Sequence, residues 1–140
     1  MITQKWCDAF TVAMGIEGGE YDHDSSDSGS FTTEANGYSS GRFLGSKWGM
    51  TADDLEKVLR RECIPEDMKN CTKETAMIHY KPEYWDKLRG EEINNQWVVN
   101  KIFANGLNIG IVTEIKIIQE SYGVPITGVM DDTTIKAINS

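Results

Sequence analysis

Residues 3–19, TQKWCDAFTVAMGIEGG, join an apolar helical pattern to a cluster of glycines. The apolar side chains recur at spacings of three and four residues, which predicts a helix over residues 3–16 with one buried face. The residues of that face are Ile2, Trp6, Phe10, Ala13 and Met14. Glycines at positions 15, 18 and 19 then stop the helix. The stretch therefore predicts a core helix that ends at Glu17.

Length and composition predict one compact domain. The chain has 140 residues, of which 39% are hydrophobic and 26% charged, enough for a core that needs neither disulfide nor metal. The formal net charge of −8 argues against nucleic acid as a partner, because phosphate binding needs clustered Lys and Arg. No segment approaches the roughly 18 consecutive apolar residues of a membrane span. We expect a monomer with no membrane span.

The amino-terminal sequence and the number of cysteines indicate the compartment in which the protein is made. Asp8 interrupts the first apolar run and no small-residue cleavage pattern follows, so we expect synthesis in the cytoplasm without a signal peptide. Three cysteines leave at least one unpaired, which is not the pattern of a secreted disulfide framework. Free thiols are favoured, although Cys63 and Cys71 could close a small loop in an oxidising compartment.

The rest of the chain is mostly helical by its pattern, so the predicted fold class is all-α. The residues that cap or open further helices are Thr51, Thr72, Asn94 or Asn95, Gly110 and Asp132. Pro65 is expected to open a short connection, and Pro82 to end the helix that Thr72 caps. Trp97 is expected on a buried helical face with Val98, Ile102 and Phe103. Residues 124–129 are predicted to form a tight turn or a small β-hairpin.

Residues 20–49 are predicted to be a long acidic loop. They are rich in Gly, Ser, Asp and Asn and show no sustained apolar period, apart from short extended pieces near 30–33 and 43–48. Loops of this length without regular structure are uncommon in compact domains unless they serve a function. We therefore look for chemistry in this loop and at its start.

Glu17 is the candidate general acid. Its carboxylate stands at a helix C-terminus, where the helix dipole disfavours a negative charge and so favours the protonated form. A carboxyl group with a raised pKa could donate a proton to a leaving oxygen. The alternative is a solvated glutamate beside a glycine turn, which position alone favours. Gly18 and Gly19 have no side chains, so a long substrate could approach the backbone beside the acid.

Asp22, Asp24 and Asp27 offer a second carboxylate. One of them could activate a water, act as a nucleophile or stabilise an oxocarbenium-like transition state. Alternatively, Asp24 and Asp27 make turns by accepting backbone N–H groups two residues further on. A calcium site is a weaker option, because the D-x-D-x-x-D spacing lacks the later ligands of an EF-hand loop.

Other cofactor chemistry has little support in the sequence. The two histidines stand alone, without a Cys-x-x-Cys or His-x-x-x-His pair, so we expect no zinc and no other metal. Nucleotide-binding fingerprints are also missing from the sequence, and we expect no cofactor. Trp48 and Trp85 flank predicted loops and could stack on sugar rings.

The motifs of the first half resemble those of glycoside hydrolase family 108. Glu17-Gly18-Gly19, Tyr21, Asp27-Ser28-Gly29 and Thr32 resemble the family's opening E-G-G-Y…D-x-G-G-x-T motif, and Trp48-Gly49-Met50-Thr51 resembles its Y-G-I-T. The span from Ala76 to Trp85 resembles its A-x-x-x-Y-x-x-x-Y-W, and Asn108-Ile109-Gly110 its N-x-G. Departures are Ser30 in place of the second turn glycine and an insertion over residues 33–47.

The second half is similar to the predicted peptidoglycan-binding region that accompanies this family. Gln119, Gly123-Val124, Thr127-Gly128-Val129, Thr134 and Ala137-Ile138 match its pattern, while Ala104 stands where the family often has Asp. The resemblance implies a catalytic part over residues 1–94 and a helical peptidoglycan-binding part over residues 95–140, packed into one compact domain.

The resemblance implies a lysozyme-like N-acetylmuramidase that cleaves the β-1,4 bond between N-acetylmuramic acid and N-acetylglucosamine. Such proteins occur as phage endolysins in bacteriolysis and as muramidases tied to secretion, so the expected place of action is the periplasm or the cell wall and the partner is the glycan strand. The implied catalytic residues are Glu17 and Asp27. The implied substrate-binding residues are Gly18, Gly19, Tyr21, Thr32, Trp48, Thr51 and Asn108.

A different class of function also fits the sequence. A non-catalytic peptidoglycan-binding or secretion-accessory protein could have kept the fold and lost the activity. The insertion, Ala104 and the strong acidity favour this alternative. The insertion TEANGYSSGRF, residues 33–43, is either a flap that contacts sugar or peptide or a tolerated surface excursion.

Overall fold

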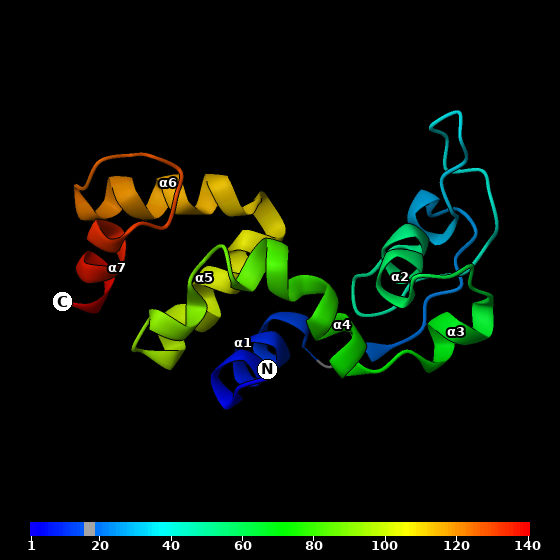
Figure 1. The fold of residues 1–140 in the computed structure, drawn as a ribbon, viewed down its shortest axis with the longest axis horizontal. Coiled ribbons are helices and arrows are strands. Elements are labelled where there is room, and N and C mark those ends of the chain that lie inside the picture. Colours follow the sequence, from blue (N-terminus) through cyan, green and yellow to red (C-terminus); the bar gives the residue numbers. More distant parts are fainter. Residues whose placement is uncertain (16–18) are drawn as a thin grey trace. The chain divides into compact units, whose positions relative to one another are not determined.

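The described part of the chain is mainly helical. The computed structural model describes residues 1–15 and 19–140. Its α-helices are α1 (Gln4–Met14), α2 (Ala52–Leu59), α3 (Pro65–Asn70), α4 (Lys73–Tyr80), α5 (Gln96–Ile109), α6 (Ile111–Tyr122) and α7 (Asp132–Asn139) (Figure 1). Shorter segments are the 3-10 helices η2 (Ser28–Ser30) and η4 (Gly90–Glu92) and the π-helical η3 (Lys81–Trp85). The predicted all-α class is confirmed.

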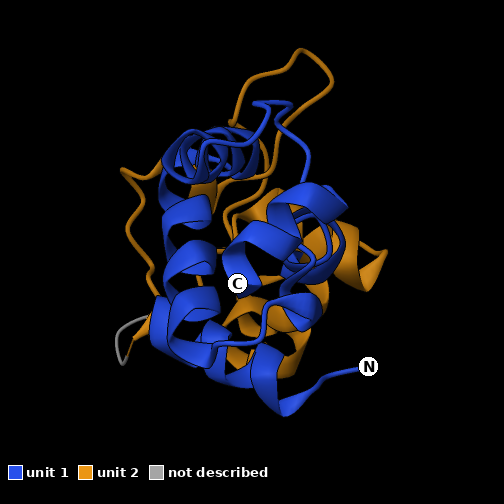
Figure 2. Cartoon of the chain, turned by 90° about the vertical axis from the view of Figure 1, so that its left-hand side faces the viewer, with its two compact units in different colours: residues 1–13, 80–140 blue, residues 14–79 orange. Residues whose placement is uncertain are grey.

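The chain forms two compact units. Unit 1 contains residues 1–13 and 80–140, and unit 2 contains residues 14–79 (Figure 2). Unit 1 is therefore built from both ends of the sequence, with unit 2 between them in the chain. The predicted division into a catalytic part and a binding part at residues 94 and 95 concerns function, and it stays a prediction, as does the packing of the two parts into one domain.

An aromatic cluster forms the core of unit 1. The rings of Trp6 and Trp85 are stacked, with centroids 4.8 Å apart and planes at 24°. Phe103 meets Trp6 edge-on at 4.9 Å, and Phe10 packs on Trp6 at 5.6 Å. The predicted inner face of α1 is confirmed at Trp6 and Phe10, which are fully buried. Trp85 is also fully buried, so the expectation that it could stack on a sugar ring is wrong.

Single residues set the boundaries of the last three helices. Asn95 caps α5, because its side chain accepts the backbone N–H three residues on. Gly110, with φ 96°, separates α5 from α6, and Gly123, with φ 67°, ends α6 in the left-handed conformation. Asp131 caps α7 in the same way as Asn95 caps α5. The predicted cap, Asp132, is instead the first residue of that helix.

The turn between α6 and α7 is organised by the side chain of Gln119. This fully buried amide accepts the backbone N–H groups of Thr127 and Gly128 at 2.9 and 3.0 Å. Its NH₂ group donates to the Val129 carbonyl at 2.9 Å and to the Thr134 hydroxyl at 3.0 Å. The predicted tight turn is present, and residues 124–129 contain no strand. One side chain thus supplies the hydrogen bonds that a hairpin would have made.

Three local predictions in the helical regions are wrong. Pro65 opens α3 rather than a connection, since the missing N–H of proline costs nothing in a first turn. Pro82 does not end its helix, because the chain continues through it as π-helical η3. Trp97 is 70% exposed. The prediction is confirmed for Ile102 and Phe103, which are buried together with Val99 and Gly106.

A hairpin-like arm, residues 31–43, rises from unit 2. Phe31 and Phe43 pair at its base, with ring centroids 5.3 Å apart. Further out, the Thr32 N–H donates to the Arg42 carbonyl at 2.9 Å, and the Glu34 N–H donates to the Tyr38 carbonyl at 2.9 Å. The short extended pieces predicted in this loop are confirmed by these pairings, together with the bridge between residues 22 and 46. Figure 1 shows the arm extending away from α2 and α3.

Candidate functional site

Trp48 lies in a strained turn of unit 2. Residues 47–50 form a tight turn in which the Met50 N–H donates to the Lys47 carbonyl at 2.9 Å. Both central residues have positive φ, 57° at Trp48 and 71° at Gly49, which is the pattern of a type I′ turn. A left-handed conformation costs a bulky residue on the order of 1–2 kcal/mol. Strain of this kind concentrates at functional sites, which makes Trp48 a candidate binding residue.

Gly19 provides the surface on which the Trp48 ring packs. A Cβ atom at Gly19 would lie 2.7 Å from Cη2 of Trp48, so a larger residue would displace the ring. The indole N–H of Trp48 also donates to the Cys71 carbonyl at 3.4 Å. The space beside Gly19 that the sequence assigned to a substrate strand is therefore occupied by the indole. Because Gly19 comes two positions after Glu17, a partly exposed aromatic ring contacts the chain just after the predicted acid.

The acidic loop is held by its own aspartates. Oδ1 of Asp22 accepts the N–H of Asp24, and Oδ1 of Asp24 accepts the N–H of Ser26, both at 2.9 Å. Oδ1 of Asp27 accepts the N–H of Gly29 at 2.9 Å and so caps η2. The alternative in which Asp24 and Asp27 form turns is confirmed. Asp27 remains exposed, so its second carboxylate oxygen faces solvent or a ligand.

Thr51 caps α2 and supports the Asp27 turn. Its hydroxyl accepts the Asp54 N–H at 3.2 Å, and the Asp54 carboxylate accepts the Thr51 N–H at 2.9 Å, which is a capping box with Asp in the third position. The predicted helix start at Thr51 is confirmed. A Cβ atom at Gly29 would lie 3.2 Å from the Thr51 methyl group. The Asp27-Ser28-Gly29 turn thus rests directly on the helix cap.

His79 joins this cap from α4. Its Nε2 lies 3.6 Å from the Asp54 carboxylate, and its side chain is only 15% exposed. Burial lowers the pKa of His79 below its usual value and Lys57 lowers it further, although Asp54 opposes both. The net effect favours the neutral imidazole. Sequence reasoning missed His79, because nothing in its local sequence connects it to Asp54.

Tyr21 fixes the loop to the base of the arm. Its hydroxyl donates to the Leu44 carbonyl at 2.9 Å. Its ring covers Gly45, where a Cβ atom would lie 2.5 Å from the Tyr21 hydroxyl oxygen. Burial is the largest cause of a raised Tyr21 pKa, followed by the charges of Glu66 and Asp22. Tyr21 is thus placed as a support of the loop.

Thr32 supports the arm in a similar way. Its side chain is buried, and its hydroxyl accepts the N–H of Arg42 at 2.8 Å. A Cβ atom at Gly41 would come within 2.1 Å of that hydroxyl, so the two strands of the arm approach closely here. The guanidinium of Arg42 donates to Glu56 and to the Cys63 carbonyl, both at 2.7 Å, and ties the base of the arm to α2.

The predicted site residues divide into three groups. Glu17 and Gly18 lie outside the described residues. Asn108 is an exposed residue of α5 in unit 1. The remaining ones lie in unit 2: Gly19, Tyr21, Asp27, Thr32, Trp48 and Thr51. Within unit 2 the structure joins Gly19 to Trp48 and the Asp27 turn to Thr51, while Tyr21 and Thr32 hold neighbouring parts of the loop.

Unit 1 carries two neighbouring depressions, of about 430 and 380 Å³. They share Lys87, Ile111 and Val112, so they form one groove along the start of α6. Ile115 and Met130 add apolar lining to the larger depression. The groove has an apolar floor, and its charged lining residues are Glu83, Asp86, Lys87 and Arg89, of which Lys87 is paired with Glu83 at 2.8 Å. Such a lining suits a ligand with both apolar and polar groups.

Residues 1–15 and 19–140 contain no group of three His, Cys, Asp or Glu side chains that could hold a metal ion. None of the helices in this part of the chain has the length and apolar character needed to cross a bilayer. None of its three cysteines forms a disulfide, and Cys63 and Cys71 are buried.

Comparison with known proteins places this helical domain among the glycoside hydrolases. Residues 10–110 match the sequence profile of the family described as Glycosyl hydrolase 108. The match covers well over half of the chain, and the protein belongs to this family. The matched region begins before Glu17 and ends at Gly110, so the last 30 residues of the sequence lie beyond it. No curated protein matches the chain significantly.

A solved structure shares the fold. The protein in "Structure of Brucella abortus SagA" is 22% identical to this chain and superimposes with a TM-score of 0.62. The match covers 95% of this chain and 67% of the Brucella abortus chain. At this level of identity the likeness concerns the fold. It extends over the C-terminal helices that the family profile does not reach.

Proposed function

We propose that the protein is a peptidoglycan hydrolase of the N-acetylmuramidase type, with Glu17 as its general acid. The substrate bond is the β-1,4 linkage between N-acetylmuramic acid and N-acetylglucosamine. The observation that carries the proposal is the contact of Trp48 with Gly19, two positions after Glu17, in a member of a glycoside hydrolase family. An aromatic ring can bind a sugar by stacking, and cleavage of a glycosidic bond uses a carboxylic acid, which the sequence supplies two positions before Gly19.

The chemistry assigned to Glu17 is proton transfer to the glycosidic oxygen. Cleavage of a glycosidic bond passes through an oxocarbenium-like transition state, and a positioned carboxylic acid lowers its energy by protonating the leaving group. In this scheme Trp48 holds a sugar ring by stacking. Its strained turn and its bond to the Cys71 carbonyl support a fixed ring orientation.

The second step needs a water or a nucleophile on the opposite face of the sugar. Asp27 is our first choice for the carboxylate that positions this water, and Asp22 the second. Each already accepts a backbone N–H through Oδ1, which leaves Oδ2 for such a role. Separations of about 5 Å between the two carboxyl groups favour a covalent intermediate, and about 6.5–9.5 Å favour direct attack by water.

Substitution at Glu17 tests the proposal. Purified peptidoglycan is incubated with wild type and with Glu17→Gln, and turbidity and released reducing ends are measured. We expect wild type to release reducing ends and Glu17→Gln to lose at least a hundredfold of the rate, the typical contribution of a general acid. Glu20→Gln is the matched control. A wild type that pellets with sacculi but releases no reducing ends would support the non-catalytic binding protein instead.

Asp27 can be tested without disturbing its turn. Asparagine keeps an Oδ1 that accepts the Gly29 N–H but has no carboxylate, whereas alanine removes both. If Asp27 positions the water, Asp27→Asn is as inactive as Asp27→Ala. If Asp27 serves only as the turn residue, Asp27→Asn keeps the wild-type rate and Asp27→Ala alone is impaired.

The C-terminal part and the place of action complete the proposal. We assign residues 95–140 to peptidoglycan binding, supported by the groove along α6 with its apolar floor and charged lining residues. The protein acts in the periplasm or at the cell wall as a monomer, either in lysis by a phage or in wall remodelling. The variant Val112→Asp places a negative charge in the groove, and its pelleting with sacculi is compared with that of wild type. Equal pelleting of the two proteins would contradict the assignment.

A further inference from the structure

The arm of unit 2 is closed by hydrogen bonds from its base to its tip. Its base is held by Thr33, whose N–H donates to Asp53 at 2.8 Å, and by the Arg42 contacts with α2. The tip closes with hydrogen bonds of its own, from the Gly37 N–H to the Glu34 carbonyl and from the Tyr38 N–H to Asn36. These bonds shape the turn that carries Tyr38.

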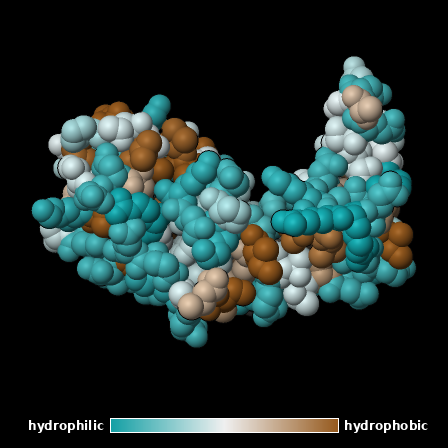
Figure 3. Space-filling view, in the orientation of Figure 1, coloured by the Kyte–Doolittle hydropathy of each residue, from teal (hydrophilic) through white to brown (hydrophobic). Residues whose placement is uncertain are grey.

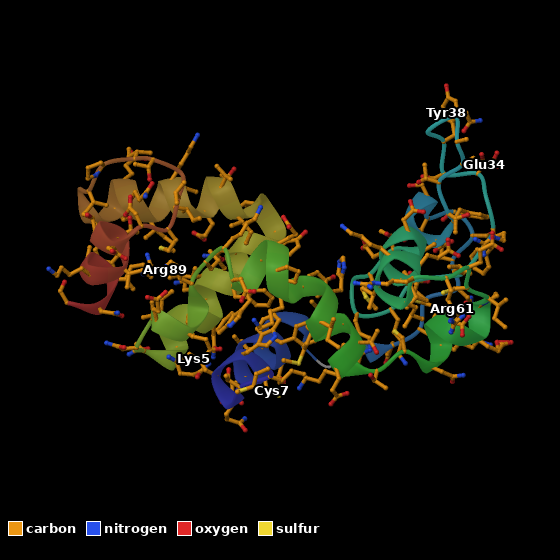
Figure 4. The ribbon with its side chains drawn as sticks, in the orientation of Figure 1. Lys5, Cys7, Glu34, Tyr38, Arg61 and Arg89 are labelled. Carbon is orange, nitrogen blue, oxygen red and sulfur yellow. The ribbon has the colours of Figure 1, made fainter. Side chains whose placement is uncertain are left out.

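Tyr38 is the side chain that the arm presents. It is 71% exposed, and Figure 4 shows it at the outer end of the arm. A tyrosine ring offers a flat apolar face at low conformational cost, and its hydroxyl can bond to polar partners. Around it stand residues of the same adaptable polar kind that recognition loops use: Asn36, Gly37, Ser39 and Ser40.

Charge identifies the kind of surface that the tip can approach. The chain has a formal charge of −8, and acidic residues recur through the loop before the arm. Residues 35–41, ANGYSSG, carry no charge at all. Figure 3 shows this end of unit 2 in teal, white and pale tan, without the saturated brown of exposed aliphatic residues. An anionic polymer therefore meets one acidic residue beside the tip, Glu34, whereas residues 22–27 of the acidic loop carry Asp22, Asp24 and Asp27.

Length decides which part of a polymer the tip could touch. The arm pairs Phe31 with Phe43 at its base and Glu34 with Tyr38 near its tip, three residues further along one side, which is roughly 10 Å of extended chain. A sugar stacked on Tyr38 is therefore displaced from the base of the arm. A ligand that contacts both Tyr38 and Trp48 has to extend beyond the sugar held at Trp48.

We propose that the arm is an accessory contact for long glycan strands, in which Tyr38 stacks on a sugar ring remote from the cleaved bond. The proposal rests on the proposed function for the identity of the polymer. Tyr38 then contributes to the binding of polymeric substrates and not to the binding of short ones. The catalytic step itself is the same for both substrates.

The test compares two substrates and a set of Tyr38 variants. Rates are measured on intact sacculi and on a soluble tetrasaccharide of the same repeating unit. Tyr38→Ala should raise the half-saturating concentration of sacculi about five- to tenfold, the effect of one stacked ring, with the maximal rate unchanged. Its rate on the tetrasaccharide should equal that of wild type. Tyr38→Phe and Tyr38→Trp keep a ring and should behave as wild type on both substrates.

Controls separate this proposal from the function on which it rests. Ile64→Ala removes an apolar side chain that is 60% exposed elsewhere in unit 2, and it should change nothing. Tyr38→Ala leaves the backbone bonds of the tip intact, and circular dichroism checks the fold. The proposal is overturned if the half-saturating concentration of sacculi is the same for Tyr38→Ala and wild type. It is also overturned if the activity of Tyr38→Ala falls as much on the tetrasaccharide as on sacculi. A Tyr38-dependent dimer in sedimentation would overturn it in favour of a second copy of the chain.

If wild type cleaves neither substrate, the proposed function fails and binding becomes the readout. Pelleting of wild type with sacculi that Tyr38→Ala weakens would still support the arm as a glycan contact. Pelleting that is equal in the two proteins, or absent in wild type, would overturn it.

Discussion

The two units of this chain are stabilised in different ways. Unit 1 is organised by apolar burial, with Trp6, Trp85 and Phe103 packed into one aromatic cluster. Unit 2 depends heavily on polar contacts between side chains and backbone, such as the Asx turns of its acidic loop and the capping box of α2. An apolar core loses stability when a substitution removes buried volume, whereas a network of turns loses stability when a substitution changes the backbone conformation. Substitutions in the two units should therefore fail for different reasons.

The largest expected effect is the loss of an aromatic residue from the core of unit 1. Trp85→Ala removes a fully buried ring that stacks on Trp6 and should destabilise the protein by about 3–5 kcal/mol. Trp97→Ala is the matched control, because Trp97 is 70% exposed, and it should cost less than about 1 kcal/mol. Urea unfolding followed by circular dichroism measures both. Equal costs would refute the assignment of the core.

A second comparison uses two glycines of unit 2 that share a positive φ. Gly45 has φ 81° and Gly37 has φ 87°, so alanine pays the same left-handed strain of about 1 kcal/mol at both. Only at Gly45 would the new Cβ also clash, 2.5 Å from the Tyr21 hydroxyl. We expect Gly45→Ala to cost about 2–3 kcal/mol in total.

Hydrogen exchange is the measurement for this pair. The amide of Ser46, which donates to Asp22 at 2.8 Å, should lose protection in Gly45→Ala and keep it in Gly37→Ala. If the two variants behave alike, steric contact with Tyr21 does not hold the loop.

The cap of α2 should give a smaller effect. Thr51→Ala removes the hydroxyl that accepts the Asp54 N–H and should cost about 1 kcal/mol. Thr51→Ser keeps the hydroxyl and should lie close to wild type, apart from the lost methyl contact with Gly29. Thermal unfolding compares the three proteins. A Ser variant as unstable as the Ala variant would assign the role of Thr51 to its methyl group.

The smallest effect concerns a buried acid of unit 1 and depends on pH. Glu114 is 4% exposed and its Oε2 has no hydrogen-bond partner within the described chain. Burial raises its pKa, although a hydrogen bond from Asn105 acts in the opposite direction. A carboxyl group with a raised folded pKa stabilises the protein fully below its unfolded value, and that stability is lost as the pH rises through the folded value.

Glu114→Gln removes this titration. We expect the urea concentration at the unfolding midpoint of wild type to fall, relative to that of the variant, as the pH rises from 4 towards 7. Urea unfolding at several pH values measures the difference between the two midpoints. A constant difference across that range would show that Glu114 does not titrate differently in the folded protein.

Periodicity and capping residues predicted much of the helical framework, for a physical reason. Helix formation depends on neighbours three and four positions away, so Trp6, Phe10 and the caps Thr51 and Asn95 are readable locally. Trp97 was misplaced because the α5 sequence offers two apolar faces, and only packing against the rest of unit 1 selects between them. Local sequence does not contain that information.

The candidate site was harder to predict because its contacts are not local. Trp48 meets Gly19, and Tyr21 meets Gly45, across long stretches of loop. The family motif indicated Gly19, Tyr21 and Trp48, whereas Gly45 lies in the insertion and had no motif. Their physical roles depend on which glycine lies opposite which ring. His79 had no motif, and only the fold reveals its approach to Asp54.

The discontinuous construction of unit 1 has a consequence for folding. The Thr3 hydroxyl donates to Glu91, a contact that spans 88 positions, and α1 finds its aromatic partners at similar separations. Contacts of this kind close large loops and slow the search for the native state. During synthesis the apolar face of α1 leaves the ribosome well before its partners. Until residues 80–109 follow, that face has no native cover, and the nascent chain is exposed to aggregation and in need of chaperones.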